Sequence, residues 1–149
     1  MKVSDIREHF ISELKNENFT IDKTGAKTIE LIGASFTADE PSIFGTPNQE
    51  YIDKEIAWYK SMSNNINDIN KEGEPPAAWK YAANEHGEIN SNYGLLTMSE
   101  QYHDQLGHVA DELVTNPDSR RACMIYNRPS IWLEYDKGGM SDFICTNAV

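Results

Sequence analysis

The chain has 149 residues, which suits one domain with its own core and is small for two. Hydrophobic residues make up 39% and aromatic residues 10%, and this composition excludes a disordered chain. The formal net charge of −11 repels nucleic acid and anionic lipid, so we expect no direct nucleic-acid binding and no membrane association. Two cysteines cannot build a disulfide framework, which favours a cytoplasmic protein.

The first elements in chain order are predicted to be a helix and a strand. An apolar stripe from Ile6 to Leu14 predicts the helix, and Asp5 with Glu8 three residues later resembles a capping pair. Residues 27–36 are rich in β-branched side chains and alternate in polarity, which predicts a strand. Gly33 within that run indicates a bulge or, as the alternative, a bend between two short strands.

A second helix is predicted after the Pro- and Gly-containing loop of residues 41–47. Its apolar face includes Tyr51, Ile56 and Tyr59 at helical spacing, and Glu55 lies on the same face. A carboxylate on a core-facing position is costly unless it is paired or poised for chemistry. Helix edges also carry glutamates for no functional reason, so the spacing leaves both interpretations open.

The remaining sequence predicts an α+β domain with its strands mostly in the second half. The predicted elements are a surface loop over 64–76, a short helix over 77–84, a turn over 91–94 that presents Tyr93, a helix from Tyr102 to Leu113 capped by Ser99 and ended by Asn116-Pro117, and β-rich runs over 122–126, 131–135 and 143–149. The last run has no turn, cap or polar tail, which is unusual for a natural terminus. We therefore expect the chain to be the front piece of a longer fold, with a short docked edge strand as the alternative.

Three features could carry chemistry. Glu55 is the first, and the adjacent Arg120 and Arg121 are the second, because guanidinium groups bind phosphate in a bidentate manner. Cys145 in an apolar run is the third. The ordinary interpretations are a solvated arginine pair and an inert buried thiol, and we accept the latter for Cys123. The four histidines have no metal-ligand spacing, so we expect no metal.

The order of these features along the chain resembles the thymidylate synthase superfamily, most closely its phage branch of deoxycytidylate 5-hydroxymethyltransferases. The matching stretches are DKTG at 22–25, KEIAWYK at 54–60, GEINSNYG at 87–94, NPDSRR at 116–121 and MSDFICTN at 140–147. The resemblance extends over nearly the whole chain. It implies a thymidylate synthase-like fold and one domain over residues 1–149 whose C-terminal part is absent. It also implies a homodimer in the full-length family.

The resemblance implies transfer of a one-carbon unit from 5,10-methylenetetrahydrofolate to C5 of dCMP, followed by hydration to 5-hydroxymethyl-dCMP. Cys145 matches the nucleophile that adds to C6 of the base, a step that suits a soft thiolate. Glu55 matches the glutamate that organises water and proton transfer around the base. The alternatives are thymidylate synthase or dUMP hydroxymethylase chemistry on the same scaffold, and a non-catalytic truncated subunit that binds a partner chain.

The remaining site residues are also implied by the resemblance. Lys23 matches a phosphate-binding lysine, and Arg120 and Arg121 match a pair that reaches the partner subunit's nucleotide phosphate. The folate and active-site cavity residues are Trp79, Tyr93 and Asn147. The synthases place Pro-Pro before the nucleophile and His after it, whereas residues 143–144 are Phe-Ile and residues 146–147 are Thr-Asn, which favours the hydroxymethylases. Base-reading contacts are expected beyond Val149, so we expect the isolated chain to be inactive.

Overall fold

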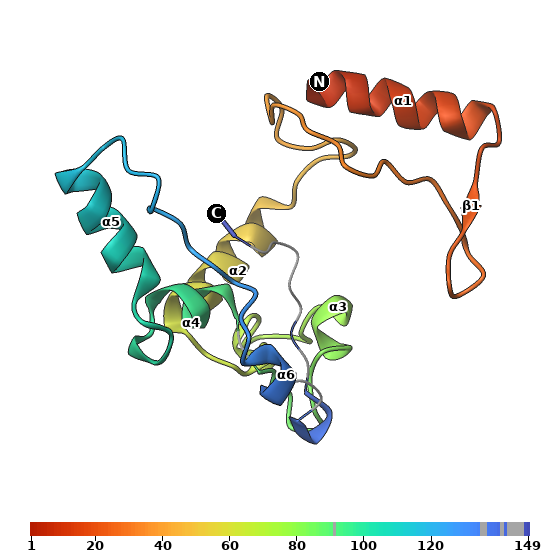
Figure 1. Ribbon diagram of the computed structural model, residues 1–149. Helices are drawn as coiled ribbons and strands as arrows, with labels where there is room; N and C mark the ends of the chain where they lie inside the picture. Colours follow the sequence, from red (N-terminus) through yellow and green to blue (C-terminus); the bar gives the residue numbers. More distant parts are fainter. Residues whose placement is uncertain (91, 135–136, 141, 143–147) are drawn as a thin grey trace. The chain divides into compact units, whose positions relative to one another are not determined.

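The computed structural model describes residues 1–90, 92–134, 137–140, 142 and 148–149 (Figure 1). The helices are α1 (Val3–Lys15), α2 (Gln49–Ser61), α3 (Ala77–Lys80), α4 (Tyr93–Met98), α5 (Gln105–Thr115) and α6 (Ile131–Glu134), the 3-10 helices are η1 (Ile66–Asp68), η2 (Glu100–Tyr102) and η3 (Lys137–Gly139), and the strands are β1 (Thr20–Ile21) and β2 (Lys27–Thr28). Residues 1–49 and 50–149 form two compact units. This mixture of helices and a small sheet is consistent with the predicted α+β class.

The first unit is organised around α1, as predicted. The Asp5 carboxylate accepts the backbone N–H of Lys2 at 2.8 Å, so the capping partner of Asp5 is Lys2 and not Glu8. Ile6 is buried, but Leu14 is 59% exposed, so only the first half of the expected stripe is covered. Arg7 attaches α1 to the segment that contains Ile43, because its Nε donates to the carbonyl oxygen of Ile43 at 2.7 Å.

The prediction of one strand over residues 27–36 is wrong. Only β2 pairs, in antiparallel register with β1, and residues 29–36 form neither strand nor helix. Gly33 has φ +68° in a turn, which agrees better with the alternative of a bend. The physical reason is that a β-prone run becomes a strand only beside a partner, and among the described residues β1 offers two positions of pairing.

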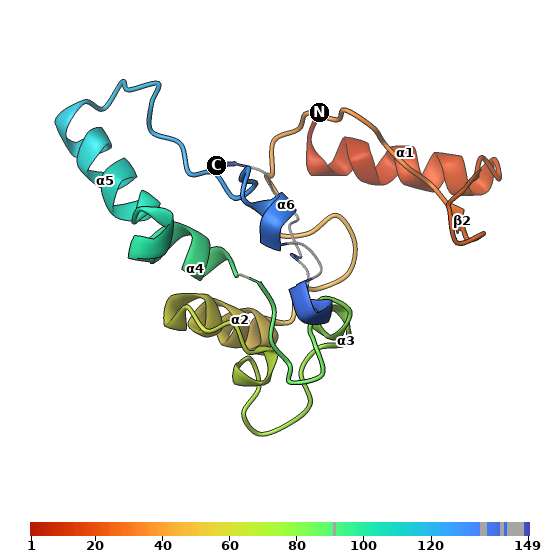
Figure 2. The same cartoon turned by 60° about the horizontal axis from the view of Figure 1, so that its bottom comes forward.

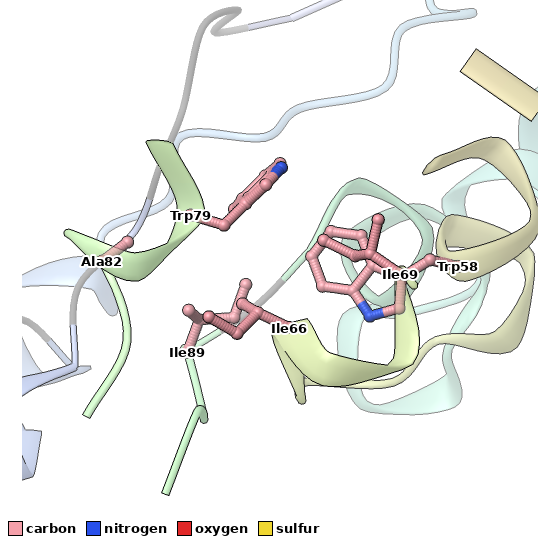
Figure 3. Packing of buried hydrophobic residues seen from close by; sticks show 6 residues of the cluster. All are labelled: Trp58, Ile66, Ile69, Trp79, Ala82 and Ile89. Atoms are coloured by element: carbon pink, nitrogen blue, oxygen red, sulfur yellow. The ribbon is translucent and has the colours of Figure 1, made fainter. Parts of the chain in front are cut away.

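The second unit is built on α2, whose prediction is confirmed. Its innermost side chain is Trp58, which is 2% exposed and packs in a cluster with residues far along the chain (Figure 3). The cluster consists of Trp58, Ile66, Ile69, Trp79, Ala82 and Ile89. Tyr51 and Tyr59 of the predicted face pack against this cluster, whereas Ile56 is 44% exposed.

Residues 64–76 are not the surface loop that their polarity predicted. Ile66 and Ile69 are each 3% exposed, and η1 carries Ile66 into the core. The backbone N–H of Ile66 donates to Gly87, and that of Ile89 donates to Asn64, both at 2.9 Å. These bonds attach residues 64–66 to residues 87–89. The free energy gained by burying the side chains of Ile66 and Ile69 therefore outweighs the preference of the surrounding asparagines for water.

Helix α4 replaces the turn that was predicted to present Tyr93. Asn92 is its N-cap, and the Asn92 side chain accepts the backbone N–H of Leu95 at 2.7 Å. Tyr93 is therefore the first residue of a helix. Gly94 follows at a point where α4 lies directly against α2, because a Cβ built on Gly94 would be 1.6 Å from the carbonyl oxygen of Tyr59.

Replacing Gly94 with alanine should lower the free energy of unfolding by about 3 kcal/mol, because the new methyl group would collide with backbone atoms of α2. Urea unfolding followed by tryptophan fluorescence measures the change. Gly73→Ala is the matched control, since its Cβ would meet only the flexible side chain of Asn70. Equal stability of the two variants would contradict the close approach of α4 to α2.

The rest of the second unit differs from the sequence prediction in its boundaries and its strands. α3 ends at Lys80 instead of residue 84. α5 is capped by Asp104 and not by Ser99, although it ends before Asn116-Pro117 as predicted. α4 contacts both η2 and α5 (Figure 2).

Two of the three β-rich runs of the second half do not form the predicted strands. Residues 122–126 form only an isolated bridge between Ile125 and Ala148, and residues 131–134 are helix α6. Most of the run 143–149 lies outside the described residues. Among the described residues, the two-stranded sheet lies in the first half of the chain.

Candidate functional site

The centre of the candidate site is the Glu55 carboxylate on α2. Tyr59, one turn after it on the same helix, hydrogen-bonds to this carboxylate, and Tyr51, one turn before it, lies close enough for the carboxylate to raise the pKa of its phenol. Residues four apart on a helix lie on the same face, so the sequence brings these three side chains together. Burial raises the pKa of the Tyr59 phenol well above its usual range, and the bond to Glu55 raises it further. Tyr59 is therefore a protonated donor at neutral pH.

Trp79 connects this carboxylate to the core. Its indole Nε1 donates to the Tyr51 hydroxyl oxygen at 3.2 Å, and its ring contacts Trp58 edge to face with centroids 4.9 Å apart. Trp79 is only 4% exposed. Burial, followed by the bond to Glu55, raises the pKa of Tyr51, so this phenol also keeps its proton. The Tyr51 hydroxyl thus links the buried Trp79 to the face of α2 on which Glu55 lies.

Tyr93 and Tyr126 extend the aromatic cluster from Tyr59. The ring centroid of Tyr93 lies 5.5 Å from that of Tyr59 and 4.9 Å from that of Tyr126. The close approach at Gly94 brings Tyr93 to this position. The structure therefore brings together three of the predicted site residues, Glu55, Trp79 and Tyr93, in one cluster of the second unit.

Lys23 lies in the first unit, at the exposed tip of the β1–β2 hairpin. The turn is organised by Asp22, whose Oδ1 accepts the backbone N–H groups of Thr24 at 2.8 Å and of Ala26 at 3.0 Å. Bonds from the Thr24 hydroxyl and these amides lower the pKa of Asp22. Gly25, with φ +86°, lets the chain turn back. The hairpin presents Lys23 to solvent.

Arg120 and Arg121 follow α5, and they differ in their surroundings. The Arg121 guanidinium lies 3.1 Å from Glu112, which also accepts the Ser119 hydroxyl at 2.5 Å. The bonds from Ser119 and then Arg121 lower the pKa of Glu112. Arg120 is exposed, and among the described residues its guanidinium forms no ion pair. The pair thus offers one anchored and one projecting cation.

Two predicted site residues, Cys145 and Asn147, lie outside the described residues. Cys123 is described, and it is exposed and free of any disulfide. The assignments of Cys145 and Asn147 therefore stay predictions.

A buried ionic cluster around Arg128 was missed by the sequence reasoning. Its guanidinium pairs with Glu134 and with Asp142, whose side chain is 3% exposed, and it stacks 5.0 Å from the Tyr102 ring centroid. Burial by itself raises the pKa of Glu134, but the bonds from Arg128 and Ser130 outweigh it and leave the pKa lowered. The only sequence signal was an arginine close to two acidic residues, a common surface pattern. A cavity of about 800 Å³ lies beside Arg128 and Trp132.

Glu134→Gln should cost about 1–3 kcal/mol of stability at pH 7, because it removes a charged hydrogen-bond acceptor from Arg128. The lowered pKa means that the stabilisation is present above the ordinary glutamate value of 4.5 and is lost as the pH falls through the lower folded value. Urea unfolding from pH 7 to pH 3 should therefore show the two proteins converging. Glu30→Gln, at an exposed position, is the control. A difference that is constant with pH would contradict the ion pair.

No group of three or more His, Cys, Asp or Glu side chains among the described residues is arranged to hold a metal ion. None of the helices in the described ranges is both long and apolar enough to cross a membrane.

The order of the motifs, the Glu55 cluster and the arginine pair agree with one class of protein. The family model of thymidylate synthase matches residues 8–134, so the chain belongs to the thymidylate synthase family.

Three curated relatives of the chain carry the same name. They are the deoxycytidylate 5-hydroxymethyltransferases of Enterobacteria phages T4, T2 and T6, each 54% identical over all 149 residues. The chain spans 60% of the length of each of these relatives.

Proposed function

We propose that the chain is the N-terminal part of a phage deoxycytidylate 5-hydroxymethyltransferase that acts in the host cytoplasm. The observation that carries the proposal is the 54% identity over every residue of the chain to relatives of that name. The geometry supports it, because a carboxylate held by protonated phenols inside an aromatic cluster suits proton transfer around a planar base.

In the proposed reaction, the Cys145 thiolate adds to C6 of dCMP, and C5 becomes nucleophilic. C5 then forms a bond to the one-carbon unit, loses its proton, and gains an exocyclic methylene as tetrahydrofolate leaves. Water adds to this methylene, and the C6–sulfur bond breaks to release 5-hydroxymethyl-dCMP and regenerate the thiolate. Glu55 orients the water and relays the protons. These steps need a base and a nucleophile but no redox partner.

The proposed substrate contacts come from residues with different exposure. Lys23 and Arg120 project from the chain, which fits capture of a nucleotide phosphate. Arg120 and Arg121 are proposed to act on the phosphate held by the partner subunit of a homodimer. The cosubstrate is 5,10-methylenetetrahydrofolate. The half-buried Tyr93 ring is proposed to contact its flat pterin, and Asn147 is proposed to belong to the same site. The buried Trp79 donates a hydrogen bond to Tyr51, so its proposed role is to support this site from the core.

The experiment measures folate-dependent tritium release from C5 of dCMP and identifies the product by mass spectrometry. It uses the chain alone and the chain joined to the part of the phage T4 relative beyond the matched 60%. We expect 5-hydroxymethyl-dCMP from the completed enzyme and no turnover by the chain alone.

The other outcomes separate the competing functions. Preference for dUMP, with thymidylate or hydroxymethyl-dUMP as product, would replace the proposed substrate. A completed enzyme that turns over neither nucleotide would favour a non-catalytic subunit. Turnover by the chain alone at the rate of the completed enzyme would contradict the expected position of the missing contacts.

A further inference from the structure

The tyrosines on either side of Glu55 form a symmetrical arrangement along α2. Tyr51 and Tyr59 are one helical turn before and after the glutamate, so both side chains share its face of α2. The Tyr59 hydroxyl hydrogen-bonds to the carboxylate, and the Tyr51 hydroxyl accepts the indole N–H of Trp79. An ionised carboxylate accepts hydrogen bonds at about four lone-pair positions, so two phenols leave capacity for water or a substrate proton.

Each of the two phenols is itself held in place by another aromatic residue. Tyr51 receives the indole N–H of Trp79 at 3.2 Å, and Trp79 is buried in the core cluster. The Tyr59 ring lies between those of Trp58 and Tyr93, at centroid distances of 5.4 and 5.5 Å. The hydroxyl groups thus have little freedom to follow a moving carboxylate. A donor whose own position is fixed can orient its acceptor.

A purely structural role would not require these groups. Leucine or phenylalanine at positions 51 and 59 would fill the same face of α2, and an apolar residue at position 55 would remove the need to satisfy a half-buried charge. The arrangement instead retains a carboxylate between two phenols, and the Tyr59 hydroxyl gives it a charge-assisted hydrogen bond, which is stronger than a bond between neutral groups.

We propose that Tyr51 and Tyr59 are positioning residues that hold the Glu55 carboxylate in one orientation for proton transfer and water activation. This inference rests on the proposed function, since it assigns the two phenols to the reaction of the same site. Neither tyrosine needs to contact the nucleotide; each acts through Glu55. Losing one phenol leaves the carboxylate charged but free to turn about its side-chain bonds.

The kinetic test uses Tyr51→Phe and Tyr59→Phe in the completed enzyme described above. Phenylalanine keeps the ring contacts and removes only the hydroxyl, so each variant should fold. We expect kcat to fall about 10- to 100-fold while KM for dCMP stays nearly constant, because misplacing a catalytic group affects the chemical step. Tyr81→Phe is the matched control, since Tyr81 is 88% exposed, and its kcat should not change.

A second readout needs no turnover and uses the 149-residue chain. Tyrosine labelled with ¹³C at Cζ reports the hydrogen bonding of each phenol by NMR, and the Tyr→Phe variants assign the resonances. Glu55→Gln should shift the resonances of Tyr51 and Tyr59 and leave that of Tyr81 unchanged. This measurement tests the contacts separately from catalysis.

The outcomes distinguish this inference from the proposed function. Unshifted Tyr51 and Tyr59 resonances in Glu55→Gln would overturn the inference. A Tyr59→Phe enzyme with kcat within about twofold of the wild type would also overturn the inference, even if the wild type makes 5-hydroxymethyl-dCMP as proposed. A wild-type completed enzyme that makes no such product overturns the proposed function, and the positioning role is lost with it.

Discussion

Cys145→Ala should abolish hydroxymethylation of dCMP by the completed enzyme, with a loss on the order of 10⁴-fold or more, since Cys145 is the proposed nucleophile of the C6 adduct. Without the adduct, C5 does not become nucleophilic, so tritium release from C5 must stop together with product formation. The assay therefore follows both tritium release and 5-hydroxymethyl-dCMP. Loss of both at once is the signature of a missing nucleophile.

Cys123→Ala is the matched control for the nucleophile. Cys123 is exposed and has no partner in a disulfide, so its removal should leave most of the activity. Both variants change one cysteine to alanine in the same chain, which separates a chemical effect from general thiol loss. Hydroxymethylation retained by Cys145→Ala would refute the assignment, and equal loss in both variants would show that the thiols act otherwise than proposed.

Mixing Arg120→Ala subunits with Cys145→Ala subunits should restore activity that neither homodimer has. If Arg120 serves the partner's site, each heterodimer has one site with its own cysteine and the partner's arginine. Random exchange makes half of the dimers mixed, and one of the two sites in each is complete. The expected activity is about a quarter of the wild-type value. Arg120 suits this role because it is exposed, whereas Arg121 is anchored to Glu112.

The control for this mixing experiment places both substitutions in one chain. Subunits that carry Arg120→Ala and Cys145→Ala together, mixed with wild-type subunits, form heterodimers in which the wild-type cysteine meets the partner's altered Arg120. Those heterodimers should be inactive if the arginine acts across the dimer. Absence of restored activity in the first mixture, with subunit exchange demonstrated by mass spectrometry, would show that the arginine acts within its own subunit.

Features that depend on near neighbours in the chain were predictable. The spacing of apolar residues predicted α1 and α2, and Asn116-Pro117 predicted the end of α5. The same periodicity placed Glu55 on one face with two tyrosines. The periodicity did not show whether these tyrosines are core residues or hydrogen-bonding partners of Glu55, because a tyrosine ring can pack in a core while its hydroxyl donates a hydrogen bond.

The strands could not be predicted in this way. Runs such as 27–36 and 131–135 have β-prone residues, yet strand formation depends on a partner supplied by another part of the chain. Among the described residues, β1 supplies two positions of pairing to β2, and residues 131–134 form α6 instead, with Glu134 paired to Arg128.

The sequence by itself determined the family through the order of its motifs, and the helices α1, α2 and α5 through local spacing. The resemblance assigned Trp79 and Tyr93 to the site, but only the tertiary structure decided how they reach Glu55. Trp79 and Tyr93 are 24 and 38 residues further along the chain, and they reach α2 through the buried cluster and the close approach at Gly94. Packing between distant segments depends on the shape and volume of many side chains at once, and no local pattern encodes it.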